Sequence, residues 1–310
     1  MIVTVTMNPA IDKTVDVEGF EAGGLNRIKR MVSDAGGKGI NVSKTICKLG
    51  GKTVATGLIG GSAGRMIVDV LNNWGIENDF VTVNGETRTN TKIVDPEIGV
   101  TELNEPGPVV SLEEINELLN KLEGYAEEGT LFVLSGSIPA GVNKDIYKII
   151  TEKVHAKGAK VLLDADGDLF TASLDAVPDM IKPNRDELER YFGLDYRPGQ
   201  EELIQMGRQF LDRGIGTVNI SLGQMGALFL SQEKCYKSDA LSVNVHSTVG
   251  AGDAMVAAMA YGWEQGMSME ENAKLSVATS AGAVTTIGTK PPERELVDEL
   301  FGKVVLKEIG

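Results

Sequence analysis

Short apolar runs rich in β-branched residues alternate along this chain with longer segments that are apolar on one side only. Segments such as 112–125 and 252–265 place their apolar residues at helical spacing. A regular alternation of strands and helices is typical of a parallel sheet with helices on both faces. The pattern therefore predicts a doubly wound, mostly parallel α/β fold. Buried strands are expected at residues 2–7, 53–59, 131–134, 160–164 and 217–222.

Two segments interrupt this rhythm. Residues 11–33 and 87–105 alternate weakly between apolar and polar side chains, and each contains a turn, at residues 21–24 and at Asp95-Pro96. Such half-exposed hairpins favour a small β-sheet that is inserted in two pieces. We expect one α/β domain over residues 1–310, with the small sheet as an accessory to it.

Charge and cysteine content narrow the function classes. The chain has 44 acidic and 30 basic residues and a formal net charge of -14, which argues against nucleic acid or an anionic membrane as the main partner. An anionic ligand would need a local basic cluster. Cys47 and Cys235 are far apart and form no C-x-x-C motif, so neither a disulfide framework nor a zinc site is indicated. Without a signal core or a membrane-length apolar run, we expect a soluble cytoplasmic protein.

Two glycine-rich loops lead directly into helices. Gly250-Ala251-Gly252-Asp253 precedes one helical pattern, and Gly36-Gly37-Lys38-Gly39 precedes another. The first turn of a helix exposes unpaired backbone N–H groups, and glycine lets an anion approach them closely. Asp253 therefore predicts a carboxylate beside a phosphate cradle, and its place at the helix start suggests that it stays ionised. The alternative is that Asp253 only caps the helix.

Polar residues follow nearly every predicted strand. Ligands of doubly wound sheets bind at the carboxyl ends of the strands, so these residues are candidates for one site. Taken singly, each also fits ordinary turn chemistry, and Asn184 with Glu187 has the spacing of a helix capping box. The candidates are Asn8 and Asp12, residues 36–41, Ser135 to Ser137, Asp164 and Asp166, residues 182–187, residues 221–226, and residues 250–253.

Common nucleotide-binding motifs are absent from the sequence, which contains neither G-x-x-x-x-G-K-[ST] nor G-x-G-x-x-G. Residues 60–64 do match the G-x-S-x-G motif of a hydrolase, with Ser62 as the nucleophile. A catalytic triad would need a histidine, and only His155, expected on a helix face, and His246, expected in a strand-like segment, are available. A serine hydrolase stays a distant alternative.

Several motifs together resemble one family. They are Gly36-Gly37-Lys38-Gly39-Ile40-Asn41, Lys182-Pro183-Asn184-x-x-Glu187, Ser221-Leu222-Gly223-x-x-Gly226 and Thr248 to Asp253. In this order, they are similar to the motifs of the ribokinase-like carbohydrate kinases of the phosphofructokinase B type. Asn8-Pro9-Ala10-x-Asp12, Thr87-Arg88-x-Asn90 and Thr101 to Asn104 resemble the bacterial 1-phosphofructokinases and the closely related tagatose-6-phosphate kinases.

The resemblance implies an ATP- and Mg²⁺-dependent kinase of a phosphorylated ketohexose. The favoured reaction converts fructose 1-phosphate to fructose 1,6-bisphosphate, with tagatose 6-phosphate as the alternative substrate. A sensor that binds the sugar phosphate without catalysis is a further alternative. The resemblance implies that Asp253 is the catalytic base and that Gly250, Ala251 and Gly252 form the anion hole. It assigns the sugar phosphate to Asp12, Gly37, Lys38, Asn41, Arg88, Ser137 and Arg27.

The same resemblance implies the remaining roles. Lys182, Asn184, Ser221, Gly223 and Gly226 would bind the nucleotide, and Glu187 and Asp166 would hold Mg²⁺ through water. The inserted β-sheet would act as a lid over the sugar and could join two subunits in a homodimer. Gly24 departs from relatives that carry a basic residue there, which removes one expected contact with the phosphate.

Overall fold

A large central sheet forms the body of the protein in the computed structural model, which describes residues 1–309. From β12 to β5 neighbouring strands are parallel, whereas β13, β14 and β15 continue the sheet in antiparallel fashion. In spatial order the strands are β15 (Leu306–Glu308), β14 (Cys235–Ser238), β13 (Ala227–Leu230), β12 (Thr217–Ser221), β11 (Met180–Ile181), β10 (Lys160–Asp164), β9 (Leu131–Ser135), β1 (Ile2–Thr6), β4 (Thr53–Ile59) and β5 (Glu77–Asn78), with β6 (Val81–Thr82) also paired to β4.

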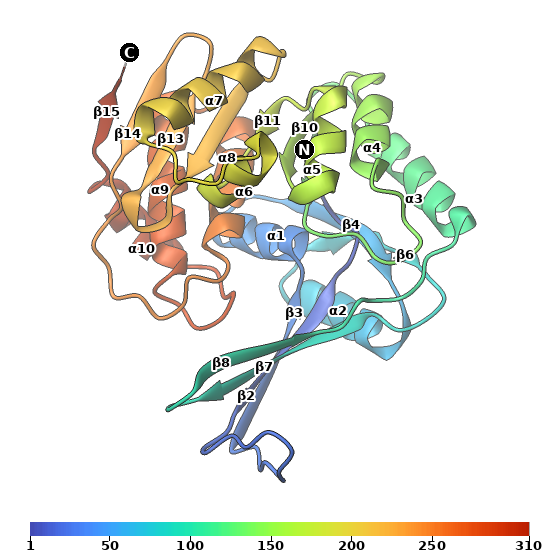
Figure 1. The fold of residues 1–310 in the computed structure, drawn as a ribbon. Coiled ribbons are helices and arrows are strands. Elements are labelled where there is room, and N and C mark those ends of the chain that lie inside the picture. Colours follow the sequence, from blue (N-terminus) through green and yellow to red (C-terminus); the bar gives the residue numbers. More distant parts are fainter. Residues whose placement is uncertain (310) are drawn as a thin grey trace.

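Helices cover both faces of this sheet (Figure 1). Successive side chains of a strand point to opposite faces, so in β1 Ile2 packs into one apolar core and Val3 into the other. The core around Ile2 includes α1 (Lys38–Lys48), α8 (Ala251–Glu264), α9 (Met269–Ala283) and α10 (Arg294–Phe301). The core around Val3 includes α3 (Leu112–Tyr125), α4 (Ile146–His155), α5 (Gly167–Ser173), α6 (Arg185–Phe192) and α7 (Gln200–Asp212).

A second sheet of four strands projects from the body (Figure 1). Its spatial order is β3 (Arg30–Gly36), β2 (Ala10–Asp16), β7 (Arg88–Asp95) and β8 (Gly99–Asn104). The central pair β2 and β7 is parallel, and each outer pair is antiparallel. Helix α2 (Gly61–Asn73) packs near its base, where Ile67 and Leu71 meet Ile11 in a third apolar cluster. We call this four-stranded sheet the lid.

The predicted doubly wound fold with a small inserted sheet is confirmed. The lid strands follow the two predicted segments closely, although β2 begins at Ala10 and β3 extends to Gly36. Two short 3₁₀ helices, at Leu174–Ala176 and Gly223–Met225, complete the structure. Within residues 1–309 no helix is long and apolar enough to cross a membrane.

Candidate active site

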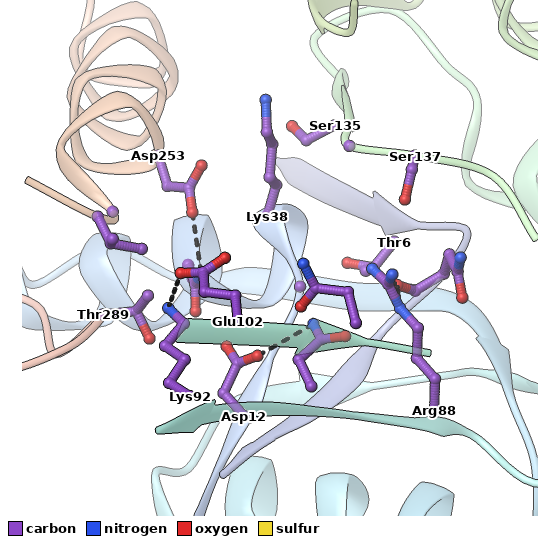
Figure 2. Close-up of a pocket in the computed structure, with 18 of the residues that line it drawn as sticks. Thr6, Asp12, Lys38, Arg88, Lys92, Glu102, Ser135, Ser137, Asp253 and Thr289 are labelled. Atoms are coloured by element: carbon purple, nitrogen blue, oxygen red, sulfur yellow. Dashed lines mark hydrogen bonds and ion pairs between the residues drawn. The ribbon is translucent and has the colours of Figure 1, made fainter. Parts of the chain in front are cut away.

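A cavity of about 440 Å³ lies between the lid and the carboxyl ends of the central strands. Figure 2 shows Asp253 and Lys38 on its helical side, facing Asp12, Lys92 and Arg88 from the lid. Local structure determines the position of each side chain. Asp253 lies in the first turn of α8, Lys38 begins α1, and Asp12 lies on β2. The cavity is therefore built where two glycine-rich helix starts meet the lid.

Asp253 is nearly buried, with 8% of its surface exposed. Its carboxylate oxygen Oδ2 accepts a 2.8 Å hydrogen bond from Asn41 Nδ2 of α1. Burial is the largest cause and raises the pKa of Asp253 to about 6. The nearby Lys38 only partly offsets this effect, and the charge of Asp164 adds to it. The carboxyl still stays mostly ionised near neutral pH, as its place at the helix start suggests, but desolvation outweighs the helix dipole and makes it a stronger base.

Two lysines share one buried carboxylate beside Asp253. Asp164, 2% exposed, lies 3.1 Å from Lys38 Nζ through one oxygen and 3.1 Å from Lys182 Nζ through the other. Burial opposes the ionised form of Asp164, yet its pKa is lowered because Lys182 and Lys38 stabilise the negative charge. Asp164 in turn raises the pKa of Lys38. This ion pair keeps the Lys38 ammonium group charged at the centre of the site.

The lid contributes a second set of polar groups. Asp12 Oδ1 accepts a hydrogen bond of 3.2 Å from Asn90, and burial raises the pKa of the Asp12 carboxyl. Arg88 donates through Nε and Nη2 to the backbone carbonyl of Asn8, at 3.2 and 3.0 Å, which fixes its guanidinium at the edge of the cavity. Lys92 lies farther along β7 and also lines the cavity. Glu102 of β8 lies 3.6 Å from Lys92 Nζ, so the lid face carries both acidic and basic groups.

Several buried polar atoms around the cavity have no partner within the described chain. They are Thr6 Oγ1, Asn8 Oδ1, Asn41 Oδ1, Asn90 Oδ1 and Ser135 Oγ, and all five residues line the cavity. Buried oxygens without hydrogen bonds are costly, so such a cluster is typical of a site whose ligand supplies the missing partners. A ligand with many hydroxyl groups fits this arrangement.

A second region adjoins the cavity beyond Lys182. A Cβ added to Gly252 would lie 3.6 Å from Lys182 Nζ, so this ammonium group lies beside the start of α8. Asn184 pairs with Ser221 in a short parallel bridge, which places the start of α6 next to the end of β12. The predicted capping box is present: Asn184 Oδ1 accepts from the Glu187 backbone, and Glu187 Oε2 accepts from the Asn184 backbone, both at 2.8 Å.

Glycine is needed at Gly250 and at Gly226 for two different reasons. Gly250 caps α8 with a φ of 87°, a conformation that side chains rarely adopt. At Gly226 a Cβ would lie only 1.9 Å from the carbonyl oxygen of Ser238. The first glycine shapes the anion-friendly start of α8, and the second allows two backbone segments to pass closely beside the candidate nucleotide region.

Comparisons with known proteins agree with this geometry. A model of the pfkB family carbohydrate kinases matches residues 5–296. The chain belongs to the pfkB family of carbohydrate kinases. It is 34% identical over 309 residues to a 1-phosphofructokinase of Haemophilus influenzae, covering 99% of this chain and 98% of that protein. A 1-phosphofructokinase of Bacillus subtilis is also 34% identical, over 304 residues and 98% of both chains.

Two solved structures of kinases have the same architecture. Escherichia coli phosphofructokinase-2, solved with substrates and products, is 26% identical and superposes with a TM-score of 0.92 over 97% of this chain and 98% of that one. Arabidopsis thaliana ribokinase shares the fold at 24% identity, with a TM-score of 0.79, over 97% of this chain and 98% of that one.

Most residues that the sequence assigned to a sugar kinase site lie together around the cavity. Its lining includes Asp12, Gly37, Lys38, Asn41, Arg88, Ser137, Asp166, Gly250 and Asp253. Lys182 reaches the same region through Asp164. Arg27 is different, because it is exposed in the loop between β2 and β3 and does not belong to the cavity lining of this chain.

Sequence reasoning missed three contributors to this kinase site. Asp164 was noted only as a residue after a strand, yet it joins Lys38 to Lys182. Lys92 and Thr289 line the cavity without belonging to any motif recognised in the sequence. The strand register that pairs β2 with β7 was needed to place Lys92 on the same face of the lid as Asp12 and Asn90.

The hydrolase alternative has little structural basis. Ser62 donates a 2.8 Å hydrogen bond to Glu86, not to a histidine. His155 lies on α4 as expected and contacts Asp179, 2.9 Å away. His246 lies in the loop before α8, so the expectation of a strand there is wrong. Within the described residues 1–309, Ser62 forms no hydrogen bond with His155 or His246.

Proposed function

We propose that this pfkB kinase transfers the terminal phosphoryl group of ATP to the 6-hydroxyl of fructose 1-phosphate, giving fructose 1,6-bisphosphate. The observation that carries the proposal is the buried carboxylate of Asp253, held by Asn41 at the start of α8 and facing a polar cavity. Relatives from Haemophilus influenzae and Bacillus subtilis that match nearly the whole chain are named 1-phosphofructokinases, which supports this substrate.

Asp253 acts as the general base in this proposal. Its pKa of about 6 leaves it mostly ionised near neutral pH and makes it a stronger base than an ordinary aspartate. It accepts the proton of the attacking hydroxyl, while the backbone N–H groups of Gly250, Ala251 and Gly252 stabilise charge on the transferred phosphoryl. Phosphoryl transfer proceeds through a loose transition state, so positioning and charge stabilisation supply most of the rate.

The sugar phosphate lies against the lid. Arg88, already oriented by the Asn8 carbonyl, binds the phosphate through its planar fork, and Lys38 adds positive charge from the opposite wall. Asp12, Asn41 and the backbone of Gly37 face the sugar hydroxyls, with Ser137 at the far edge. The unpaired oxygen atoms of the cavity then gain the hydroxyl donors that they lack.

The nucleotide occupies the region beside Lys182 and the end of β12. Lys182 and Asn184 approach its phosphates, and Ser221, Gly223 and Gly226 shape the neighbouring surface. Magnesium, when bound, neutralises phosphate charge. Among residues 1–309 no group of three or more acidic, histidine or cysteine side chains could hold a metal. Mg²⁺ commonly keeps several waters, so contacts from Glu187 and Asp166 through water fit this donor set.

The lid excludes water from the reaction, because a kinase open to solvent would hydrolyse ATP. Its outer strands carry exposed apolar side chains, among them Met31 on β3 and Val100 on β8. We include a homodimer formed through the lid in the proposal, since such patches mark interfaces between proteins. The proposed location is the cytoplasm, where ATP is available and both free cysteines remain reduced.

A substrate panel tests the proposed reaction. ADP release is measured with fructose 1-phosphate, fructose 6-phosphate and tagatose 6-phosphate, each at several concentrations, and the sugars are ranked by kcat/KM. We expect fructose 1-phosphate to rank first. A higher kcat/KM for tagatose 6-phosphate would assign the chain to the alternative reaction. Sugar binding without ADP release would replace the kinase with a sensor, and labelling of Ser62 by a fluorophosphonate would favour a hydrolase.

A further inference from the structure

A second cavity of about 200 Å³ lies far along α8 from Asp253. It lies between the central sheet and the α8–α9 pair, and its lining includes Met180 and Asn219 from the sheet and Met259 and Trp263 from α8. A helix rises about 1.5 Å per residue, so Trp263 lies roughly 15 Å along the axis from Asp253. The cavity is therefore separate from the candidate active site.

The second cavity is lined mostly by apolar side chains, and its polar lining residues are Thr217, Asn219 and Asn272. Asn219 is 3% exposed, and its Oδ1 has no hydrogen-bond partner within the described chain. Its neighbours on β12, Val218 and Ile220, point into the opposite core, so Asn219 alone directs a carboxamide from this strand toward α8. A buried acceptor without a partner destabilises the fold by roughly 1–3 kcal/mol.

Asn272, a second asparagine that lines the cavity, has hydrogen-bond partners for its side chain, unlike Asn219 Oδ1. Asn272 of α9 donates to the carbonyl of Met259 at 3.0 Å, and its Oδ1 accepts from Ser276 at 3.3 Å. It also packs closely on α8, because a Cβ at Gly262 would lie 2.3 Å from its Nδ2. Asn272 is thus accounted for as a structural bond between two helices, whereas Asn219 is not.

The other walls of the cavity favour an aromatic occupant. Phe229 and Trp263 offer ring surfaces, and methionine sulfur atoms make favourable contacts with aromatic rings. The volume is below the roughly 300–1,000 Å³ of sites for drug-sized ligands, so the occupant is small. Half-buried Trp263, Met267 and Met269 lie at the turn between α8 and α9, which gives the cavity a route to the surface.

We propose that this cavity is a second small-molecule site, which takes a compact aromatic ligand carrying one N–H or O–H donor for Asn219 Oδ1. The ligand contacts α8 and α9 together, and α8 carries Asp253 at its other end. Because most of α8 is buried, it has little freedom to absorb a local shift. The site is therefore placed to influence catalysis without overlapping the substrates.

The test uses indole and 1-methylindole, which differ in whether they carry the N–H donor. The full chain is labelled with [¹³C-methyl]methionine, and each probe is titrated while the methyl signals are recorded. Indole is expected to shift the signals of Met180, Met259, Met267 and Met269 in a saturable manner. 1-Methylindole should bind at least about tenfold more weakly, because it leaves the Asn219 oxygen unpaired.

Two variants locate the effect. In Asn219→Leu the two probes should bind equally, since the acceptor is gone. In Thr217→Val, which changes another polar residue of the lining, the preference for indole should remain. Saturating fructose 1-phosphate should leave the indole shifts in place. Equal binding of the two probes to the wild-type chain, shifts at other methionines without shifts at these four, or displacement by the sugar would each overturn the proposal, whatever the outcome of the substrate panel.

Discussion

Asp253 is placed where its charge is useful for catalysis and unfavourable for stability. Burial raises its pKa from 3.8 to about 6, so the folded protein binds a proton more tightly than the unfolded chain does. Such a group stabilises the fold fully below the unfolded pKa, and this contribution is lost as the pH rises through about 6. At neutral pH the ionised carboxylate therefore costs on the order of 3 kcal/mol.

Asp253→Asn tests both consequences. The variant should lose roughly 10²-fold or more in kcat, because no base accepts the hydroxyl proton. It should also unfold at higher denaturant concentration than the wild type near pH 8, with the difference shrinking toward about pH 4 as the wild-type carboxyl becomes protonated. The measurements are steady-state kinetics and urea unfolding at both pH values. Near-normal turnover, or a stability difference that does not change with pH, would contradict the assignment of Asp253 as a base with a raised pKa.

The wild-type pH profile supplies an independent check of the same residue. Catalysis requires the ionised carboxylate, so kcat/KM should fall as the pH drops below about 6, the pKa of Asp253. The measurement is kcat/KM for the sugar phosphate between about pH 5 and pH 8. ATP is kept at saturating concentration, which separates the fall at low pH from effects on ATP binding. A profile that stays flat down to about pH 5 would show that another group accepts the proton.

Arg88 separates binding of the sugar phosphate from binding of ATP. Its guanidinium is fixed by the Asn8 carbonyl and lines the cavity on the lid side, away from Lys182. Arg88→Ala should raise KM for the sugar phosphate by about 10²-fold, since a charge-assisted bidentate contact contributes about 3 kcal/mol. KM for ATP, measured in the same assay, serves as the internal control and should change little. Equal changes in both would place Arg88 elsewhere.

At the residue scale, the sequence is most informative where a motif fixes the local backbone. Glycine-rich helix starts and polar residues after strands were enough to propose Lys38, Asn41 and Asp253, and all three line the cavity. The role of Asp164 depends on strand order, because β10 must lie beside β11 for one carboxylate to reach both lysines. The raised pKa of Asp253 depends on how tertiary packing excludes water, which no local pattern contains.

At the scale of elements, α6 and α3 begin in the same way. Asn184 with Glu187 and Ser111 with Glu114 each form a complete capping box. The spacing of the first pair was read correctly from the sequence, because a capping box is a local structure. Short elements such as α10 and β15 gave no comparable signal, since a few residues carry too little periodicity to predict them.

This pair of helices offers a matched experiment. Asn184→Ala and Ser111→Ala should each lower the free energy of unfolding by about 1 kcal/mol, the usual cost of a lost N-cap. Only Asn184→Ala should also raise KM for ATP, because the start of α6 adjoins Lys182 and Ser221 in the candidate nucleotide region. Urea unfolding and ATP kinetics measure the two effects. Similar KM values for the two variants would remove Asn184 from the nucleotide site.

At the scale of the whole molecule, the lid is the part of the single chain whose apolar side chains are most exposed to solvent. Val100 and Leu103 on β8 are 61% and 57% exposed, and Met31 on β3 is 57% exposed. The chain carries a net charge of -14, which opposes self-association. A dimer would therefore need a specific apolar interface to overcome that repulsion, and Val100 on β8 and Val32 on β3, both exposed on one face of the lid, supply part of one.

Val100→Asp tests this interface directly. Light scattering of the wild type at micromolar concentration should give twice the chain mass of 33.1 kDa. Val100→Asp should give the monomer mass, because two new charges would face each other or the partner's apolar side chains across the interface. Val305→Asp is the control: Val305 is 69% exposed but lies outside the lid, so this variant should stay dimeric. A monomeric wild type would exclude the dimer, and a dimeric Val100→Asp would move the interface away from this strand.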